Sequence, residues 1–157
     1  MEGQIILAVG IGIAAVAEDL WRREISNWTS LAALVGGFGL HFYERGTHGL
    51  VSVFLSALAG FCVFLTFYLL GGMGGGDVKL MAGFGAVLGR PGVLLEAALL
   101  TAFIGGVMAL AVLVFRGLAR LVRKPKVHDE TLAEKRAHIP YAPAITLGVW
   151  LSLLGNF

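Results

Sequence analysis

The amino-acid sequence predicts an all-α membrane protein, a polytopic bundle of about six transmembrane helices that forms a single domain over residues 1–157. The first reason is composition: 57% of the 157 residues are hydrophobic and only 14% are charged. The mean hydropathy is +0.84, which lies well above the balance of a soluble domain. The second reason is that the apolar segments are too numerous for a single anchor on a soluble body. Most of the chain is therefore expected to lie in a lipid bilayer.

Six segments are apolar enough to be considered as membrane helices, given that about 20 residues are needed to cross a hydrocarbon core about 30 Å thick. They are predicted at about 4–20, 28–43, 49–70, 77–90, 92–116 and 139–156. The second and fourth are short for a full crossing. Because the fourth contains Gly83, Gly85 and Gly89, we expect it either to pack closely on neighbouring helices or to begin inside the glycine-rich run before it.

The positions of Lys and Arg predict the orientation in the membrane, because cytoplasmic loops carry an excess of these residues. Of the 12 Lys and Arg residues, all except Arg45 and Arg90 fall on one side. That side is expected to be cytoplasmic and to hold a basic loop at about 116–138, which we interpret mainly as a topology signal. The net charge of +2 is small and the basic residues cluster in this loop, so nucleic acid is not an expected partner.

Two aspartates, Asp19 and Asp77, are predicted at the same, cytoplasmic ends of their helices. Acidic side chains near membrane depth are costly and generally face a bundle interior or a water-filled cavity. Both are therefore candidate functional residues. For Asp19, which lies beside Glu18 and Arg22, an interfacial carboxylate that simply reaches water is an alternative.

A glycine-rich run, Gly-Gly-Met-Gly-Gly-Gly, occupies residues 71–76 directly before Asp77. It is not a Walker phosphate loop, because Asp77 stands where that motif needs lysine, and no register fits the dinucleotide-binding fingerprint. Glycine supplies backbone without side-chain bulk, which can take positive φ and lets another chain approach closely. Such a segment suits a protease whose substrate must be unwound and held beside the catalytic group.

Three short motifs together resemble those of the type IV prepilin peptidase family. Gly74-Gly75-Gly76-Asp77 has the GxGD form of intramembrane aspartyl proteases, and with Val78 and Lys79 it resembles the family's second catalytic motif. Asp19, with Arg22, Arg23 and Ile25-Ser26-Asn27 after it, is similar to the first motif. Ile139-Pro140-Tyr141-Ala142-Pro143 resembles the opening of the last helix. The departures are Ser26, where the family usually has proline, and Ala142, where glycine is common.

The resemblance is to the short, peptidase-only branch that serves Flp or Tad type pili. Larger members carry an amino-terminal cytoplasmic region with paired cysteines, associated with methylation of the new amino terminus. This chain starts directly at its first predicted helix and has a single cysteine, Cys62. N-methyltransferase activity is therefore not expected.

The function implied by the resemblance is that of an aspartyl endopeptidase in the plasma (inner) membrane, with its active site facing the cytoplasm. It would cut the short basic leader from prepilin or pseudopilin substrates whose apolar helix docks laterally. Asp19 and Asp77 would form the catalytic dyad, in which two close carboxyls share one proton, so that one acts as base and the other as acid. The substrate would approach along Gly74, Gly75, Gly76 and Lys79. A snorkelling lysine is an equal interpretation of Lys79, and neither a metal nor an organic cofactor is expected.

Two other interpretations stay open from the sequence. A small ion-coupled transporter would use the glycine-broken segment and the membrane acids as a binding site, although such carriers place their charges near the midplane and show duplicated halves. A non-catalytic pilus-assembly subunit would tolerate replacement of both aspartates.

Overall fold

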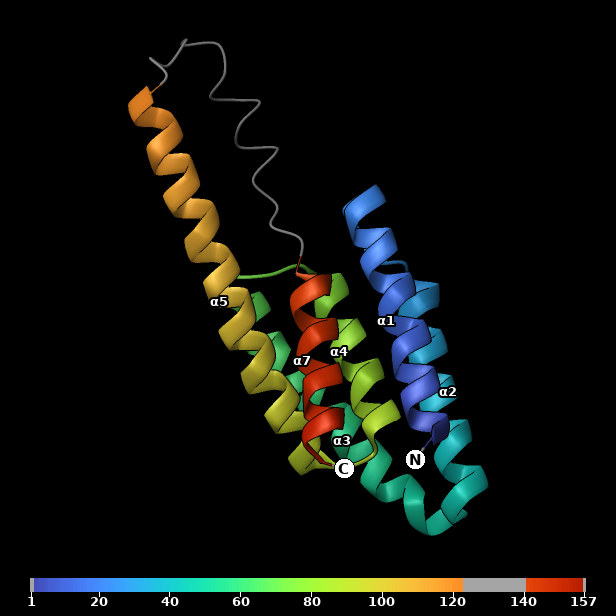
Figure 1. The fold of residues 1–157 in the computed structure, drawn as a ribbon. Coiled ribbons are helices and arrows are strands. Elements are labelled where there is room, and N and C mark those ends of the chain that lie inside the picture. Colours follow the sequence, from blue (N-terminus) through green and yellow to red (C-terminus); the bar gives the residue numbers. More distant parts are fainter. Residues whose placement is uncertain (1, 123–140, 157) are drawn as a thin grey trace.

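The computed structural model describes residues 2–122 and 141–156, and within these ranges the chain is a bundle of six α-helices. They are α1 (Glu2–Arg22), α2 (Asn27–Arg45), α3 (Thr47–Leu69), α4 (Gly75–Leu88), α5 (Pro91–Val122) and α7 (Ala142–Gly155). Successive helices run in alternating directions (Figure 1). The end of α1 and the starts of α4 and α7 consequently lie at the same end of the bundle. The predicted all-α membrane architecture is confirmed.

The boundaries of the helices agree with the predicted segments except after position 116. α5 continues to Val122, whereas the apolar pattern ends where the basic residues begin. Arginine ends an apolar run but is a good helix former, so Arg116 and Arg120 do not end the helix. The start of the predicted basic loop is therefore helical, and the rest of it, 123–138, lies outside the described residues, as do 139 and 140 of the predicted last helix.

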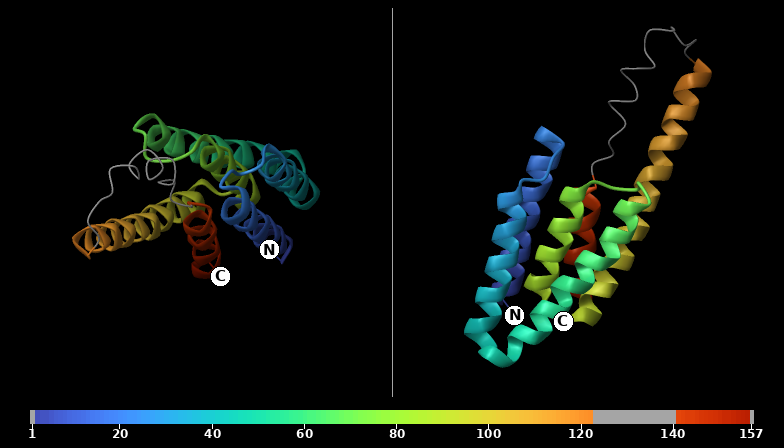
Figure 2. Two further views of the ribbon diagram at one scale, coloured as in Figure 1. Left: turned by 90° about the horizontal axis from the view of Figure 1, so that it is seen from above. Right: turned by 180° about the vertical axis from the view of Figure 1, so that it is seen from behind.

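Three of the described helices are long and apolar enough to cross a membrane: Glu2–Arg22, Thr47–Leu69 and the Pro91–Phe115 part of α5. α4 and α7 have 14 residues each, which gives a length of about 21 Å, well short of a hydrocarbon core. α4 lies in the centre of the bundle (Figure 2) and contacts the other five helices. Ten of its 14 residues are buried. Because protein surrounds it, α4 does not have to match the thickness of the bilayer.

Glycines allow α4 to pass closely between α2 and α3. A Cβ atom added at Gly85 would lie 2.5 Å from the backbone oxygen of Ser56 on α3, and one added at Gly83 would lie 2.7 Å from the Cβ of Ala33 on α2. Such small residues let helix backbones come into direct contact in a membrane. The predicted close packing of α4 is therefore confirmed. The glycines that make these contacts are Gly37 on α2, Gly60 on α3, and Gly83 and Gly85 on α4.

Gly85→Ala is expected to lower the free energy of unfolding by about 1–3 kcal/mol, because the added methyl overpacks the contact with α3. Gly39→Ala on α2 is the matched control, since nothing lies within 4 Å of a Cβ added there, and it should be at least as stable as the wild type. Thermal unfolding of the purified proteins in detergent measures both. A Gly85→Ala protein that unfolds at or above the wild-type temperature would contradict the packing.

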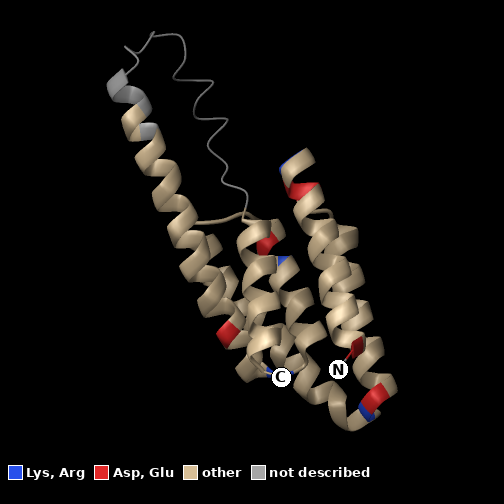
Figure 3. Cartoon of the chain, in the orientation of Figure 1, with Lys and Arg blue, Asp and Glu red and all other residues tan. Residues whose placement is uncertain are grey.

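Charged residues lie towards the two ends of the bundle, and its middle is mostly uncharged (Figure 3). The helix directions put Arg22, Arg23 and Lys79 at the end that holds Asp19 and Asp77. Arg45 and Arg90 lie at the other end, where α2 ends and α5 begins. The described basic residues are thus divided between the two ends as the sequence predicts.

Candidate active site

Asp19 and Asp77 lie at the same end of the bundle and are both buried. Asp19 is in the last turn of α1 and is 3% exposed, and Asp77 is in the first turn of α4 and is 4% exposed. The two helices contact each other. The burial of Asp19 does not fit the alternative of a carboxylate that simply reaches water. Both carboxyls are instead placed inside the protein, as a functional pair requires.

The start of α7 holds the carboxyl group of Asp19. The Oδ2 atom of Asp19 accepts a hydrogen bond of 3.0 Å from the backbone N–H of Ala142, the first residue of α7. The first N–H groups of a helix have no partner within the helix, and Tyr141 at the N-cap supplies no side-chain hydrogen bond. Asp19 therefore caps α7 from 123 positions away.

Asp77 plays a similar part at the start of its own helix. Its Oδ2 atom accepts a hydrogen bond of 3.1 Å from the backbone N–H of Gly74, the N-cap residue of α4. Because Gly74 has no side chain, the carboxylate at the third helical position stabilises this turn. One oxygen of each aspartate is thus oriented by a backbone N–H at the start of a helix.

The glycine run turns the chain from α3 into α4 and packs against the loop between α1 and α2. Gly71 takes a left-handed φ of 78°, which glycine adopts without strain. A Cβ added at Gly76 would lie 3.2 Å from the Cβ of Ile25. The missing side chain at Gly76 therefore serves a contact within the protein, whereas Gly75 is exposed. A role of Gly74, Gly75 and Gly76 in substrate approach stays a prediction.

Lys79 connects α4 to the start of α2. Its Nζ atom donates a hydrogen bond of 2.9 Å to Oδ1 of Asn27, the first residue of α2. Lys79 follows Asp77 by two positions, and residues so spaced do not share a helix face. The two interpretations of Lys79 from sequence, a place along the approach of the substrate and a snorkelling lysine, did not include this contact.

Glu18 is the residue near the site that sequence reasoning missed, because it was considered only as a neighbour of Asp19. Its carboxylate accepts a hydrogen bond of 2.9 Å from the backbone N–H of Ser26 and one of 2.8 Å from the hydroxyl of Thr29. The signal in the sequence is an acidic residue in the last turn of one predicted helix, about ten positions before the start of the next.

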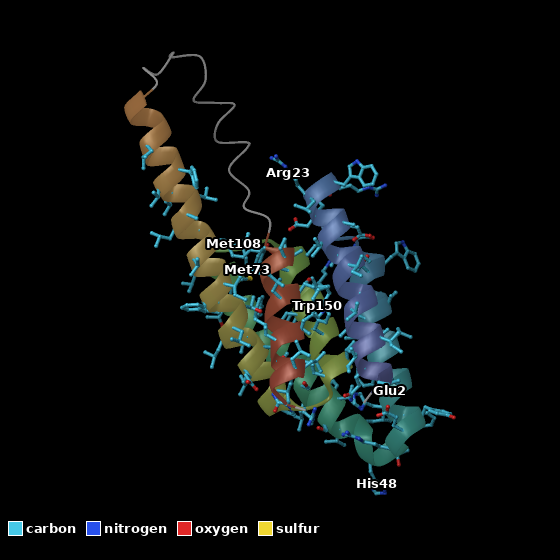
Figure 4. The ribbon with its side chains drawn as sticks, viewed as in Figure 1. Glu2, Arg23, His48, Met73, Met108 and Trp150 are labelled. Atoms are coloured by element: carbon cyan, nitrogen blue, oxygen red, sulfur yellow. The ribbon has the colours of Figure 1, made fainter. Side chains whose placement is uncertain are left out.

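A mainly apolar groove of about 190 Å³ adjoins the site. It runs between α3 and α5 and reaches the site through Met73, next to Gly74, and Tyr141, next to Ala142. Met73 lies in the same half of the bundle as Arg23, and Glu2 and His48 lie in the opposite half (Figure 4). The lining residues are Phe64, Phe67, Gly72, Met73, Thr101, Ala102, Gly105, Gly106 and Tyr141.

Comparison with known protein families gives a match over most of the chain. The family model described as "Type IV leader peptidase family" matches residues 6–114, a range that contains Asp19, the whole glycine run, Asp77 and Lys79. A search of curated proteins and a search of solved structures each gave no match. Because the matched range covers well over half of the 157 residues, this chain belongs to the type IV leader peptidase family and is a peptidase.

Proposed function

We propose that this protein is a membrane-embedded aspartyl endopeptidase that removes the short basic leader from prepilin-like substrates, with Asp19 and Asp77 as its catalytic pair. The observation that carries the proposal is the shared arrangement of the two carboxyls. Both are buried at one end of the bundle, and each has one oxygen oriented by a backbone N–H at a helix start. A peptidase that uses two carboxyl groups needs them shielded from bulk water and held in a defined orientation.

The reaction follows from the chemistry of such a pair. Two nearby carboxyls share one proton, because ionising both is costly. The ionised carboxylate removes a proton from a bound water, whose oxygen attacks the scissile carbonyl carbon. The protonated carboxyl donates a hydrogen bond to the carbonyl oxygen. When the resulting tetrahedral centre collapses, the C–N bond breaks and the leaving amine takes up a proton from the pair.

The proposed active site faces the cytoplasm from the plasma (inner) membrane. This orientation is supported by the basic residues Arg22, Arg23 and Lys79 at the end of the bundle that holds the two aspartates, since cytoplasmic ends are enriched in Lys and Arg. The substrate would be a prepilin or pseudopilin whose apolar helix lies in the same bilayer, with its leader on the cytoplasmic side.

The groove between α3 and α5 is the proposed place for apolar substrate residues next to the cleaved bond, because it reaches both the Gly74 and the Ala142 side of the site. Gly106→Leu is expected to raise KM about tenfold with a smaller effect on kcat, since a lost apolar contact changes discrimination by about that factor. Nothing lies within 4 Å of a Cβ added at Gly106, so the fold should tolerate leucine.

The control for this variant is Gly92→Leu, which also has open space around the added Cβ and lies on the same helix outside the groove. Steady-state cleavage of a purified prepilin in detergent or liposomes gives KM and kcat for both. Equal KM values for the wild type and Gly106→Leu would show that substrate does not use the groove.

The test of the function itself is cleavage of a co-expressed Flp-type prepilin, followed by gel mobility and amino-terminal sequencing of the product. We expect removal of the basic leader and a new amino terminus without a methyl group. Membership of a peptidase family already argues against the ion-coupled transporter and the non-catalytic assembly subunit. A correctly inserted wild-type protein that leaves several such prepilins intact would refute the proposal.

A further inference from the structure

The loop between α1 and α2 joins the helix that carries Asp19 to residues that pack against the helix that carries Asp77. Arg23, at its beginning, has a left-handed φ of 56°. For a residue with a Cβ atom this conformation costs about 1–2 kcal/mol. Contacts elsewhere in the loop therefore have to hold it in place.

Glu18 supplies these contacts. Its two carboxylate oxygens accept hydrogen bonds from the backbone N–H of Ser26 and from the hydroxyl of Thr29, which is buried. The hydroxyl of Ser26 in turn accepts a hydrogen bond from the backbone N–H of Trp28 and caps α2. One acidic side chain thus fastens both the end of the loop and the first turn of α2 to the last turn of α1.

The residues on either side of Ser26 contact the start of α4. Ile25 lies against Gly76, at 3.2 Å from the position of an added Cβ, and Asn27 accepts the hydrogen bond from Lys79. Gly76 directly precedes Asp77, and Lys79 follows Asp77 by two positions. The position of the loop is therefore coupled to the position of the second aspartate.

We infer that Glu18 is a positioning residue for the proposed reaction: by fixing Ser26 it sets the α1–α2 loop, and through Ile25 and Asn27 it sets Asp77 relative to Asp19. The inference rests on the proposed function for its kinetic consequences. Its structural content, an ordered loop that depends on Glu18, stands on the hydrogen bonds and the packing alone.

The backbone of Ser26 suggests a specific rescue. Ser26 has φ −63° and ψ 140°, the conformation to which proline is restricted. A proline at this position would impose the backbone angle without help, and it has no N–H that needs Glu18 as an acceptor. The same position is the one at which the resemblance to the first family motif expects proline. The hydrogen bond from Ser26 to Glu18 holds the loop in this conformation. A proline at position 26 would hold it in the same conformation without Glu18.

The kinetic test compares Glu18→Ala, Ser26→Pro and the double variant. Glu18→Ala is expected to lower kcat about tenfold or more with little change in KM, because small displacements of catalytic groups slow the chemical step. In the Ser26→Pro background, Glu18→Ala should lower kcat less than about threefold, because the effects of substitutions at sites that share a contact are not additive. Glu24→Ala, an exposed acid in the same loop, is the control and should match the wild type. An unchanged kcat in Glu18→Ala, or equal losses in both backgrounds, would overturn the inference.

A measurement independent of cleavage separates this inference from the proposed function. Spin labels on Leu20→Cys and Trp28→Cys, both exposed positions, report the distance across the loop in a Cys62→Ser background. We expect a narrow distance distribution with Glu18, a broad one in Glu18→Ala, and a narrow one again when Ser26→Pro is added. A distribution that stays narrow in Glu18→Ala would overturn the inference whatever the cleavage result. Absence of cleavage by the wild type would instead refute the proposed function.

Discussion

Asp19→Asn and Asp77→Asn are each expected to reduce cleavage of a Flp-type prepilin by at least about a thousandfold, because residues that act as one catalytic unit lose most of the rate when either is removed. The amide oxygen of asparagine can still accept the hydrogen bond from Ala142 or Gly74. The fold should therefore persist, whereas the exchange of a proton with the attacking water is lost. Gel mobility of the substrate and amino-terminal sequencing measure the effect.

Alanine at position 19 separates the structural role of the carboxyl from its chemical role. Asp19→Ala removes the cap of α7 and should lower the free energy of unfolding by about 1 kcal/mol, whereas Asp19→Asn should melt like the wild type. Glu24→Gln, an exposed acid near the same end, serves as the control with full activity. The double variant of Asp19 and Asp77 should be no slower than either single variant. Cleavage that survives in either asparagine variant would remove that aspartate from the catalytic pair.

The sequence predicts the helices well, because hydropathy reports directly which segments avoid water. It also places both aspartates at one end, since their positions follow from helix order and the distribution of basic residues. The central place of α4 was only partly predictable. Its glycines indicate close packing, but which helices surround it depends on how the whole bundle assembles.

Contacts between distant residues were the part that local patterns did not reveal. The hydrogen bond from Ala142 to Asp19 spans 123 positions and the one from Lys79 to Asn27 spans 52, so no spacing along the chain points to either. Tyr141 and Pro143 could be assigned to the start of the last helix. The capping of this start by a residue on another helix, however, depends on how the bundle folds.

The glycine run shows how one pattern can serve two purposes. From sequence it is interpreted as open backbone for a substrate, and the exposed Gly75 agrees with that interpretation. The space beside Gly76 is instead filled by Ile25 of the same chain. Absence of a side chain is equally suited to contact with a substrate and to contact with the protein itself, so only the neighbours in space distinguish the two.

Gly76→Val and Gly75→Val are expected to affect different kinetic constants. A Cβ at Gly76 lies 3.2 Å from the Cβ of Ile25, so the branches of valine would push the loop away and shift Asp77, with a loss in kcat of about a hundredfold. A Cβ at Gly75 meets Tyr68 at an ordinary 3.7 Å, so valine there should leave the site in place and raise KM if substrate passes this residue.

Steady-state cleavage of a purified prepilin by both variants distinguishes the two roles. Ile25→Ala makes room beside position 76, so the double variant Ile25→Ala/Gly76→Val should regain part of the lost kcat, whereas Ile25→Ala should give no such gain together with Gly75→Val. A rise in KM without a loss in kcat for Gly76→Val would show that position 76 contacts the substrate. It would also show that Ile25 moves aside for valine without shifting Asp77. Equal losses in kcat for both variants would mean that the run acts as a whole, through backbone freedom before Asp77, and that packing against Ile25 does not set the position of the aspartate.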